Sequence, residues 1–62
     1  MPDRCHSLAS EVHQLIMKIP PLDIPIGIRE LLKKELISCE RELGSAETKA
    51  LIASLFPPLP PH

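Results

Sequence analysis

Large aromatic side chains are nearly absent from this sequence of 62 residues, which has no tryptophan, no tyrosine and one phenylalanine. Aromatic residues usually contribute much of the buried area of a core, so leucine, isoleucine and valine must do the packing here. A chain this short buries only about 60% of its unfolded surface when it folds. We therefore expect one small core, and association between copies of the chain to form a homodimer that enlarges it.

An excess of charge of one sign is also absent, since seven basic and eight acidic residues give a formal net charge of -1. A nucleic acid or an anionic membrane is therefore not an expected partner. No apolar run approaches the roughly 18 residues of a membrane span, and the N-terminus lacks the continuous apolar segment of a signal peptide. The sequence predicts a cytoplasmic chain.

Motifs of enzymes and metal sites are missing too. There is no glycine-rich phosphate loop, no dinucleotide fingerprint, and no Ser-His-Asp or Cys-His-Asn set that can be argued from so short a chain. Cys5, His6 and His13 are too few for a structural zinc site, and Cys39 is distant in sequence. Two cysteines give no disulfide framework, so Cys39 is interpreted as a small core residue. We expect no catalysis, no metal and no cofactor.

Prolines divide the chain into helical segments. Apolar spacing predicts an amphipathic helix over residues 7–18, with Ser7 as its N-cap and Pro20 and Pro21 as its end. Its apolar face comprises Leu8, Val12, Leu15, Ile16 and Ile19. The predicted organisation is an N-terminal amphipathic helix (1–19), a Pro-rich extended linker (20–25), a helical hairpin (26–56) and a polyproline tail (57–62).

The hairpin is predicted from its turn. A helix from about Ile26 to Leu43 would end at Gly44 in the left-handed C-cap position, and Ser45 would be the N-cap of a third helix over 46–55. The face of that third helix comprises Ala50, Leu51, Ile52, Leu55 and Phe56. The predicted fold class is all-α: a small helical bundle, N-terminal helix plus helical hairpin, completed by dimerisation. The N-terminal helix either packs on the hairpin or lies in an apolar groove of a neighbouring subunit.

Two periodicities meet where the linker joins the second helix. The first apolar residues alternate, as on one face of an extended strand, and the later ones follow helical spacing. The alternating residues are Leu22, Ile24 and Ile26, and the helical ones are Ile28, Leu31, Leu32 and Leu36. Such a junction is typical of a binding segment rather than of a catalytic site.

The junction also has a resemblance, carried by Leu22, Ile24, Pro25, Gly27, Ile28, Glu30, Leu31 and Leu32. It resembles the dimerisation/docking domain of type II regulatory subunits of cAMP-dependent protein kinase and of related sperm and ciliary proteins. In that family, two hairpins form a four-helix dimer whose extended segments border a groove for an amphipathic anchoring helix. The resemblance implies that Leu22 and Ile24 contact a bound helix. It also implies that Ile28, Leu31 and Leu32 divide between the groove and the dimer core.

The leading hypothesis is therefore a non-catalytic protein–protein interaction module that dimerises and docks an amphipathic partner helix. One alternative is a small structural subunit whose apolar faces are completed by a larger assembly. Another is a carrier of a proline-rich ligand, because the tail resembles ligands of EVH1 and WW domains. That motif comprises Phe56, Pro57, Pro58, Leu59 and Pro60. The simpler interpretation is that Phe56 caps the core and the prolines end the helix.

Overall fold

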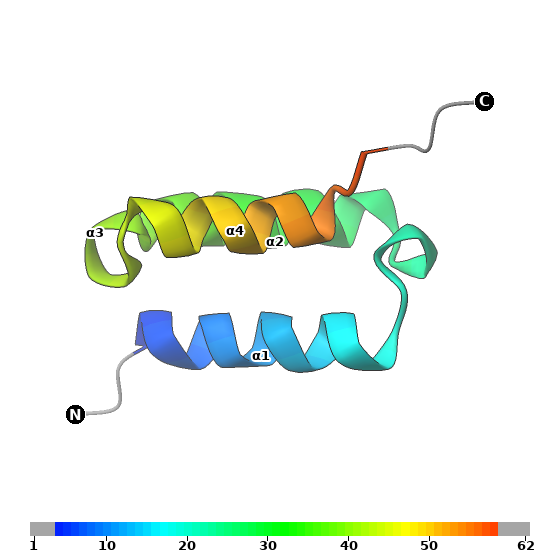
Figure 1. Cartoon of the computed structure of the whole chain (residues 1–62), viewed down its shortest axis with the longest axis horizontal. Helices are drawn as coiled ribbons and strands as arrows, with labels where there is room; N and C mark the ends of the chain where they lie inside the picture. Colours follow the sequence, from blue (N-terminus) through cyan, green and yellow to red (C-terminus); the bar gives the residue numbers. More distant parts are fainter. Residues whose placement is uncertain (1–3, 59–62) are drawn as a thin grey trace.

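The computed structural model describes residues 4–58, and within that range it contains helices and no strand. The elements are α1 (Arg4–Lys18), the 3-10 helix η1 (Pro21–Asp23), α2 (Ile26–Ser38), α3 (Glu40–Leu43) and α4 (Ser45–Leu55). α2 and α4 lie side by side and antiparallel, and α1 lies along both of them (Figure 1). The predicted all-α bundle is confirmed, with the N-terminal helix packed on the hairpin of its own chain. Its completion by dimerisation stays a prediction.

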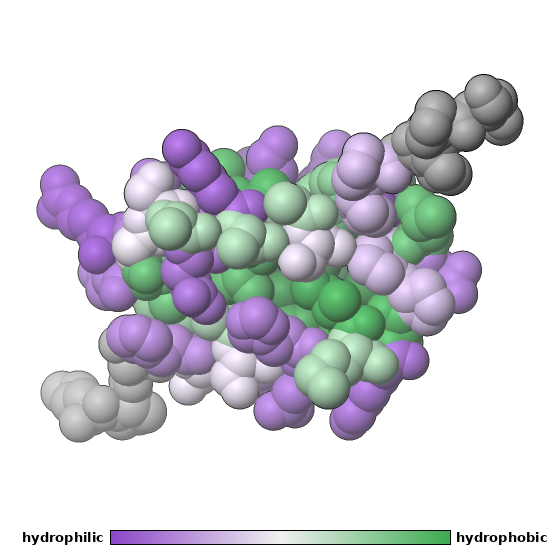
Figure 2. All heavy atoms as spheres, in the orientation of Figure 1, coloured by the Kyte–Doolittle hydropathy of each residue, from purple (hydrophilic) through white to green (hydrophobic). Residues whose placement is uncertain are grey.

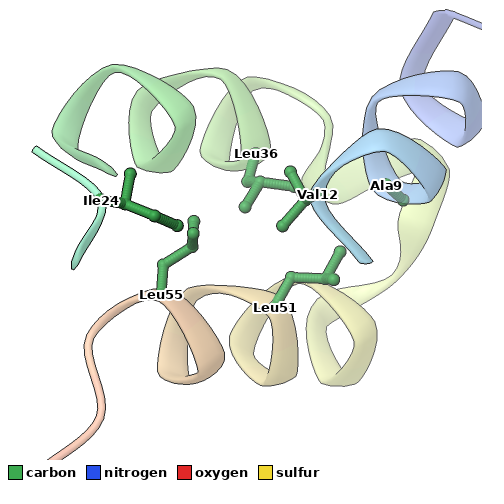
Figure 3. Packing of buried hydrophobic residues seen from close by; sticks show 6 residues of the cluster. All are labelled: Ala9, Val12, Ile24, Leu36, Leu51 and Leu55. Carbon is green, nitrogen blue, oxygen red and sulfur yellow. The ribbon is translucent and has the colours of Figure 1, made fainter. Parts of the chain in front are cut away.

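The core draws side chains from α1, α2, α4 and the linker. Its buried cluster comprises Ala9, Val12, Ile24, Leu36, Leu51 and Leu55, which point toward one another (Figure 3). Around it pack the partly buried Leu8, Leu15, Ile16, Leu32, Leu43, Ile52 and Phe56. Aliphatic residues thus do most of the packing, as the composition predicts. Hydrophobic atoms remain visible along the seam between α1 and α4, with hydrophilic atoms scattered over both helices (Figure 2).

α1 begins three residues earlier than predicted, at Arg4. The predicted N-cap, Ser7, lies exposed inside the helix instead. Contacts with a distant part of the chain hold the added residues: a disulfide joins Cys5 to Cys39, 34 positions later, and Arg4 Nη2 lies 3.6 Å from Glu35 Oε2. A capping rule considers only neighbours in sequence, so it cannot register such contacts.

The linker is more turned than predicted. α1 ends at Lys18, as the prolines require, but the segment that follows is not extended throughout. A 3-10 turn forms in it, in which the N–H of Asp23 donates to the Pro20 carbonyl (2.8 Å) and that of Ile24 to the Pro21 carbonyl (3.1 Å). Ile24 itself is extended, with φ -79° and ψ 128°. The turn redirects the chain so that Ile24 enters the core.

The predicted single helix up to Leu43 is interrupted at Cys39, where φ is -97° and ψ is 5°. α2 therefore ends at Ser38 and the short α3 completes the segment. The Cys39 N–H donates to the carbonyls of Glu35 (3.1 Å) and Leu36 (3.0 Å), a shared bond typical of a helix end. The interruption falls on the residue that carries the disulfide, which periodicity alone does not reveal.

Gly44 forms the predicted turn but in a different conformation. Its φ is 92° and its ψ is 147°, a combination of positive φ and extended ψ that essentially only glycine adopts, rather than the left-handed helical region. Its carbonyl accepts the N–H of Thr48 (3.0 Å), so Gly44 occupies the cap position of α4. Ser45 was predicted as that cap, but it is the first residue of the helix.

We expect Gly44→Ala to lower the free energy of unfolding by about 1–3 kcal/mol, because side chains with a Cβ rarely adopt this backbone conformation. Urea denaturation followed by circular dichroism measures the change. Gly27→Ala is the matched control, since Gly27 is helical and an added Cβ would meet nothing within 4 Å. It should leave stability unchanged or raise it by up to about 1 kcal/mol. Equal midpoints for the Gly44 variant and the natural chain would contradict the argument.

Candidate interaction surface

The outward side of α2 carries an open groove of about 470 Å³. It is lined by Gly27, Glu30, Leu31, Lys33, Lys34, Ile37 and Phe56, which we call the α2 surface. Leu31 is 59% exposed and Ile37 is 52% exposed, although both are large and apolar. Ile28, one helical turn before Leu31, is 48% exposed and extends the apolar area. The opposite side of the helix carries the fully buried Leu36.

Phe56 forms the edge of the groove and is held by two cations. The guanidinium of Arg29 lies 5.3 Å from the ring centroid, and Lys33 Nζ lies 5.6 Å from it. Both distances are in the range of a cation–π contact. Arg29 also donates from Nε to the Ile24 carbonyl and from Nη1 to the Leu55 carbonyl, each at 3.1 Å. One side chain thus ties the linker to the end of α4 and keeps the groove edge in place.

The predicted partner-binding residues divide in an unexpected way. Leu22 is 60% exposed, as a contact residue requires, but Ile24 is 4% exposed and belongs to the core. The prediction that Ile24 contacts a partner is therefore wrong for this fold, because η1 turns it inward. Ile28 and Leu31, which the resemblance divides between the groove and the dimer core, lie at the surface of the protomer. Leu32 packs partly buried against the core.

Sequence reasoning missed three apolar contributors to this region. Ile26 is 54% exposed at the first position of α2, and Ile37 and Phe56 line the groove. Ile37 was missed because it does not share the face of Leu36, on which the periodicity argument concentrated. A helical wheel drawn for the opposite face would have shown Ile37 beside Glu30 and Lys34.

The two cysteines form a disulfide, which the sequence interpretation did not include. Cys39 is buried, as expected of a small core residue, but it is bonded to Cys5, and their Cα atoms are 5.5 Å apart. The even number of cysteines was the available signal. The bond fastens the start of α1 to the junction of α2 and α3. It thereby holds in place the helix that closes the core.

Potential metal ligands are scattered in the part of the chain that the structure describes. No group of three or more histidine, cysteine, aspartate or glutamate side chains gathers there. His13 is exposed, and its Nε2 lies 3.6 Å from Glu47 Oε1, across the contact between α1 and α4. Such an exposed pair contributes little to stability.

The proline motif is described only in part. Phe56 is half-buried beneath Arg29 and Lys33, which favours its interpretation as a cap of the core. Pro57 is half-buried and Pro58 is exposed. Leu59 and Pro60, which complete the motif, lie outside the described residues.

Comparisons with known proteins returned no family model, no curated protein and no solved structure that matches this chain. The resemblance to the dimerisation/docking domain thus stays a prediction. Among the described helices, none has both the length and the apolar character that crossing a membrane requires.

Proposed function

We propose that this chain is a non-catalytic protein–protein interaction module that receives an amphipathic helix on the α2 surface. The observation that carries the proposal is the exposure of large apolar residues on and beside α2, although α1 already closes the core from the other side. These residues are Leu22, Ile26, Ile28, Leu31 and Ile37. Of these, Leu31 and Ile37 line the groove itself, and apolar residues at a groove are typical of a site for a helix with spaced apolar anchors.

The free energy available from the exposed apolar side chains favours a weak and reversible contact. Full burial of a leucine or isoleucine contributes about 1.5–3 kcal/mol, and these side chains are already half-buried. Each therefore has about 1 kcal/mol left to contribute, whereas association costs at least about 4 kcal/mol in lost freedom of motion. The partner must add anchors of its own, which an amphipathic helix with leucine or aromatic residues would do.

The expected cytoplasmic location stays a prediction. The location matters because it determines whether the disulfide between Cys5 and Cys39 is formed. The cytosol keeps most thiols reduced, so a chain that works there would have Cys5 and Cys39 separated. In an oxidising compartment α1 would stay covalently fastened. The groove residues lie on α2 and at Phe56, and none of them belongs to α1. Reduction would therefore affect the proposed binding through the stability of the whole fold, and not through a contact between the bridge and the partner.

A displayed library of amphipathic helical peptides, selected against the oxidised chain, tests the proposal. We expect the selected peptides to lose at least about tenfold in affinity for Leu31→Glu and for Ile37→Glu, because both changes place a charge among the apolar residues that line the groove. Gln14→Glu on α1 is the matched control and should change affinity less than about twofold. Peptides that bind Leu31→Glu as well as the natural chain would show that the α2 surface is not the site.

A further inference from the structure

We propose that the helix received on the α2 surface is α2 of a second copy, with the two helices antiparallel across a two-fold axis. The inference rests on the proposed function, since it assigns an occupant to the same surface. A two-fold interface requires a surface that is complementary to itself. The α2 surface meets this requirement in charge and spacing.

The seam of the proposed contact is a row of four residues on one face of α2. Gly27, Glu30, Lys34 and Ile37 follow one another at spacings of three, four and three, the repeat by which two helices pack lengthwise. All four line the groove. They are symmetric about the level of Leu32, since Gly27 and Ile37 lie five positions from it and Glu30 and Lys34 lie two. An antiparallel pair whose two-fold axis passes at that level therefore places Glu30 opposite Lys34 of the second copy, and Gly27 opposite Ile37.

The charges of the seam are complementary in this register. Glu30 faces Lys34 of the second copy, and by symmetry Lys34 faces Glu30 of the second copy. Lys33 does not compete for the same carboxylate, because its ammonium lies over the Phe56 ring. Partly buried ion pairs contribute little net affinity, but a mismatched charge is costly, so these pairs fix the register. A parallel pair in register would instead bring Glu30 against Glu30.

The apolar and small residues match in the same way. Ile37 faces Gly27 of the second copy, where no side chain obstructs its approach. Within the protomer an added Cβ at Gly27 would meet nothing, so the fold of one chain gives no reason for a glycine in this helix. Glycine weakens a helix, and close approach of a second helix supplies the missing reason. Leu31, beside the seam, comes near Leu31 of the second copy.

The contact is small, which sets the expected strength. α2 has 13 residues and is about 20 Å long. One helix pair of this length buries less than the roughly 1,200–2,000 Å² of a stable interface. We therefore expect self-association with a Kd of about 10–500 µM. It would be populated at high local concentration and absent in dilute solution.

Charge exchange tests the register. We expect Glu30→Lys and Lys34→Glu to self-associate at least about tenfold more weakly than the natural chain, because each variant places like charges together twice. An equal mixture of the two variants should associate to within about threefold of the natural chain, since every lysine then faces a glutamate. Sedimentation equilibrium of the oxidised chains measures both. Glu11→Lys and Lys18→Glu on the exposed side of α1 make the same changes in net charge and should leave the Kd within about twofold.

Each outcome decides between the two proposals. A natural chain that is monomeric up to about 1 mM overturns the second-copy inference, and so does a mixture that fails to associate more strongly than its components. If the displayed helices still require Leu31 in that case, the proposed function stands with a different protein as partner. If they do not, both proposals are wrong. Circular dichroism of each variant controls for loss of helix, because Glu30 and Lys34 stand four residues apart on α2, a spacing at which opposite charges favour the helix and like charges weaken it.

Discussion

Reduction of the bridge between Cys5 and Cys39 should lower the free energy of unfolding by about 4 kcal/mol, the largest effect that the structure predicts for a single bond. The bridge closes a loop over a sequence separation of 34 residues, and the entropy that this closure removes from the unfolded chain sets the magnitude. A domain below about 70 residues rarely has more than about 3–5 kcal/mol from its core. Loss of a native bridge from so small a domain often abolishes folding at 37 °C, so we expect the reduced chain to be largely unfolded at that temperature.

Thermal unfolding followed by circular dichroism, with and without a phosphine reductant, measures this effect. We expect the midpoint to fall by more than about 15 °C on reduction. The variant with both Cys5→Ser and Cys39→Ser is the control, because it should melt near the reduced natural chain and ignore the reductant. Thiol titration verifies that the bond has opened. A reduced chain that melts at the temperature of the oxidised one would show that α1 needs no covalent attachment.

Leu36→Ala should cost about 2–5 kcal/mol, the range for removing a large aliphatic side chain from a packed interior. Leu36 is 0% exposed and lies on α2 among core residues from α1, α4 and the linker (Figure 3). Because residues from several elements pack around Leu36, the remaining side chains can move only a little to fill the cavity. Most of the stability of a domain this small would be lost.

Leu31→Ala provides the comparison, since it makes the same chemical change on the same helix at a residue that is 59% exposed. Its effect on unfolding should stay within about 0.5 kcal/mol. Both variants are measured oxidised and at low micromolar concentration, where self-association is negligible. Guanidinium denaturation gives the two free energies. Similar losses for the two variants would mean that the inside and the outside of α2 have been assigned incorrectly.

Local signals in the sequence were sufficient to place the helices. Pro20 and Pro57 lack the N–H that a helix needs and the α4 turn needs a glycine, so the ends of α1 and α4 and the place of Gly44 follow from chain chemistry alone. The interruption at Cys39 does not follow from it. The helix is interrupted at Cys39, where the chain bonds to a residue 34 positions earlier, and the spacing of apolar residues does not record such a bond.

The sequence located the candidate site near the start of α2, but it did not identify which side chains there are exposed. Alternation grouped Ile24 with Leu22 because both would share one face of a straight strand. In the structure η1 turns Ile24 inward while Leu22 stays exposed, and Arg29 donates a hydrogen bond to the Ile24 carbonyl. Arg29 also donates to the Leu55 carbonyl at the end of α4, a contact between residues 26 positions apart. The exposure of Leu31 likewise depends on α1 covering the other side of α2. The apolar spacing within one helix does not show which of its faces another helix covers.

The bridge also determines how the folded chain would respond to a pulling force. Force applied at Arg4 and Pro58 would reach Cys5 within one residue and pass through the sulfur atoms to Cys39. The segment between the cysteines, which contains η1 and nearly all of α1 and α2, would carry no tension and would keep about 110–120 Å of contour length in reserve. Only α3, α4 and the residues after them would extend. The α2 surface therefore lies mainly on the mechanically shielded part of the molecule.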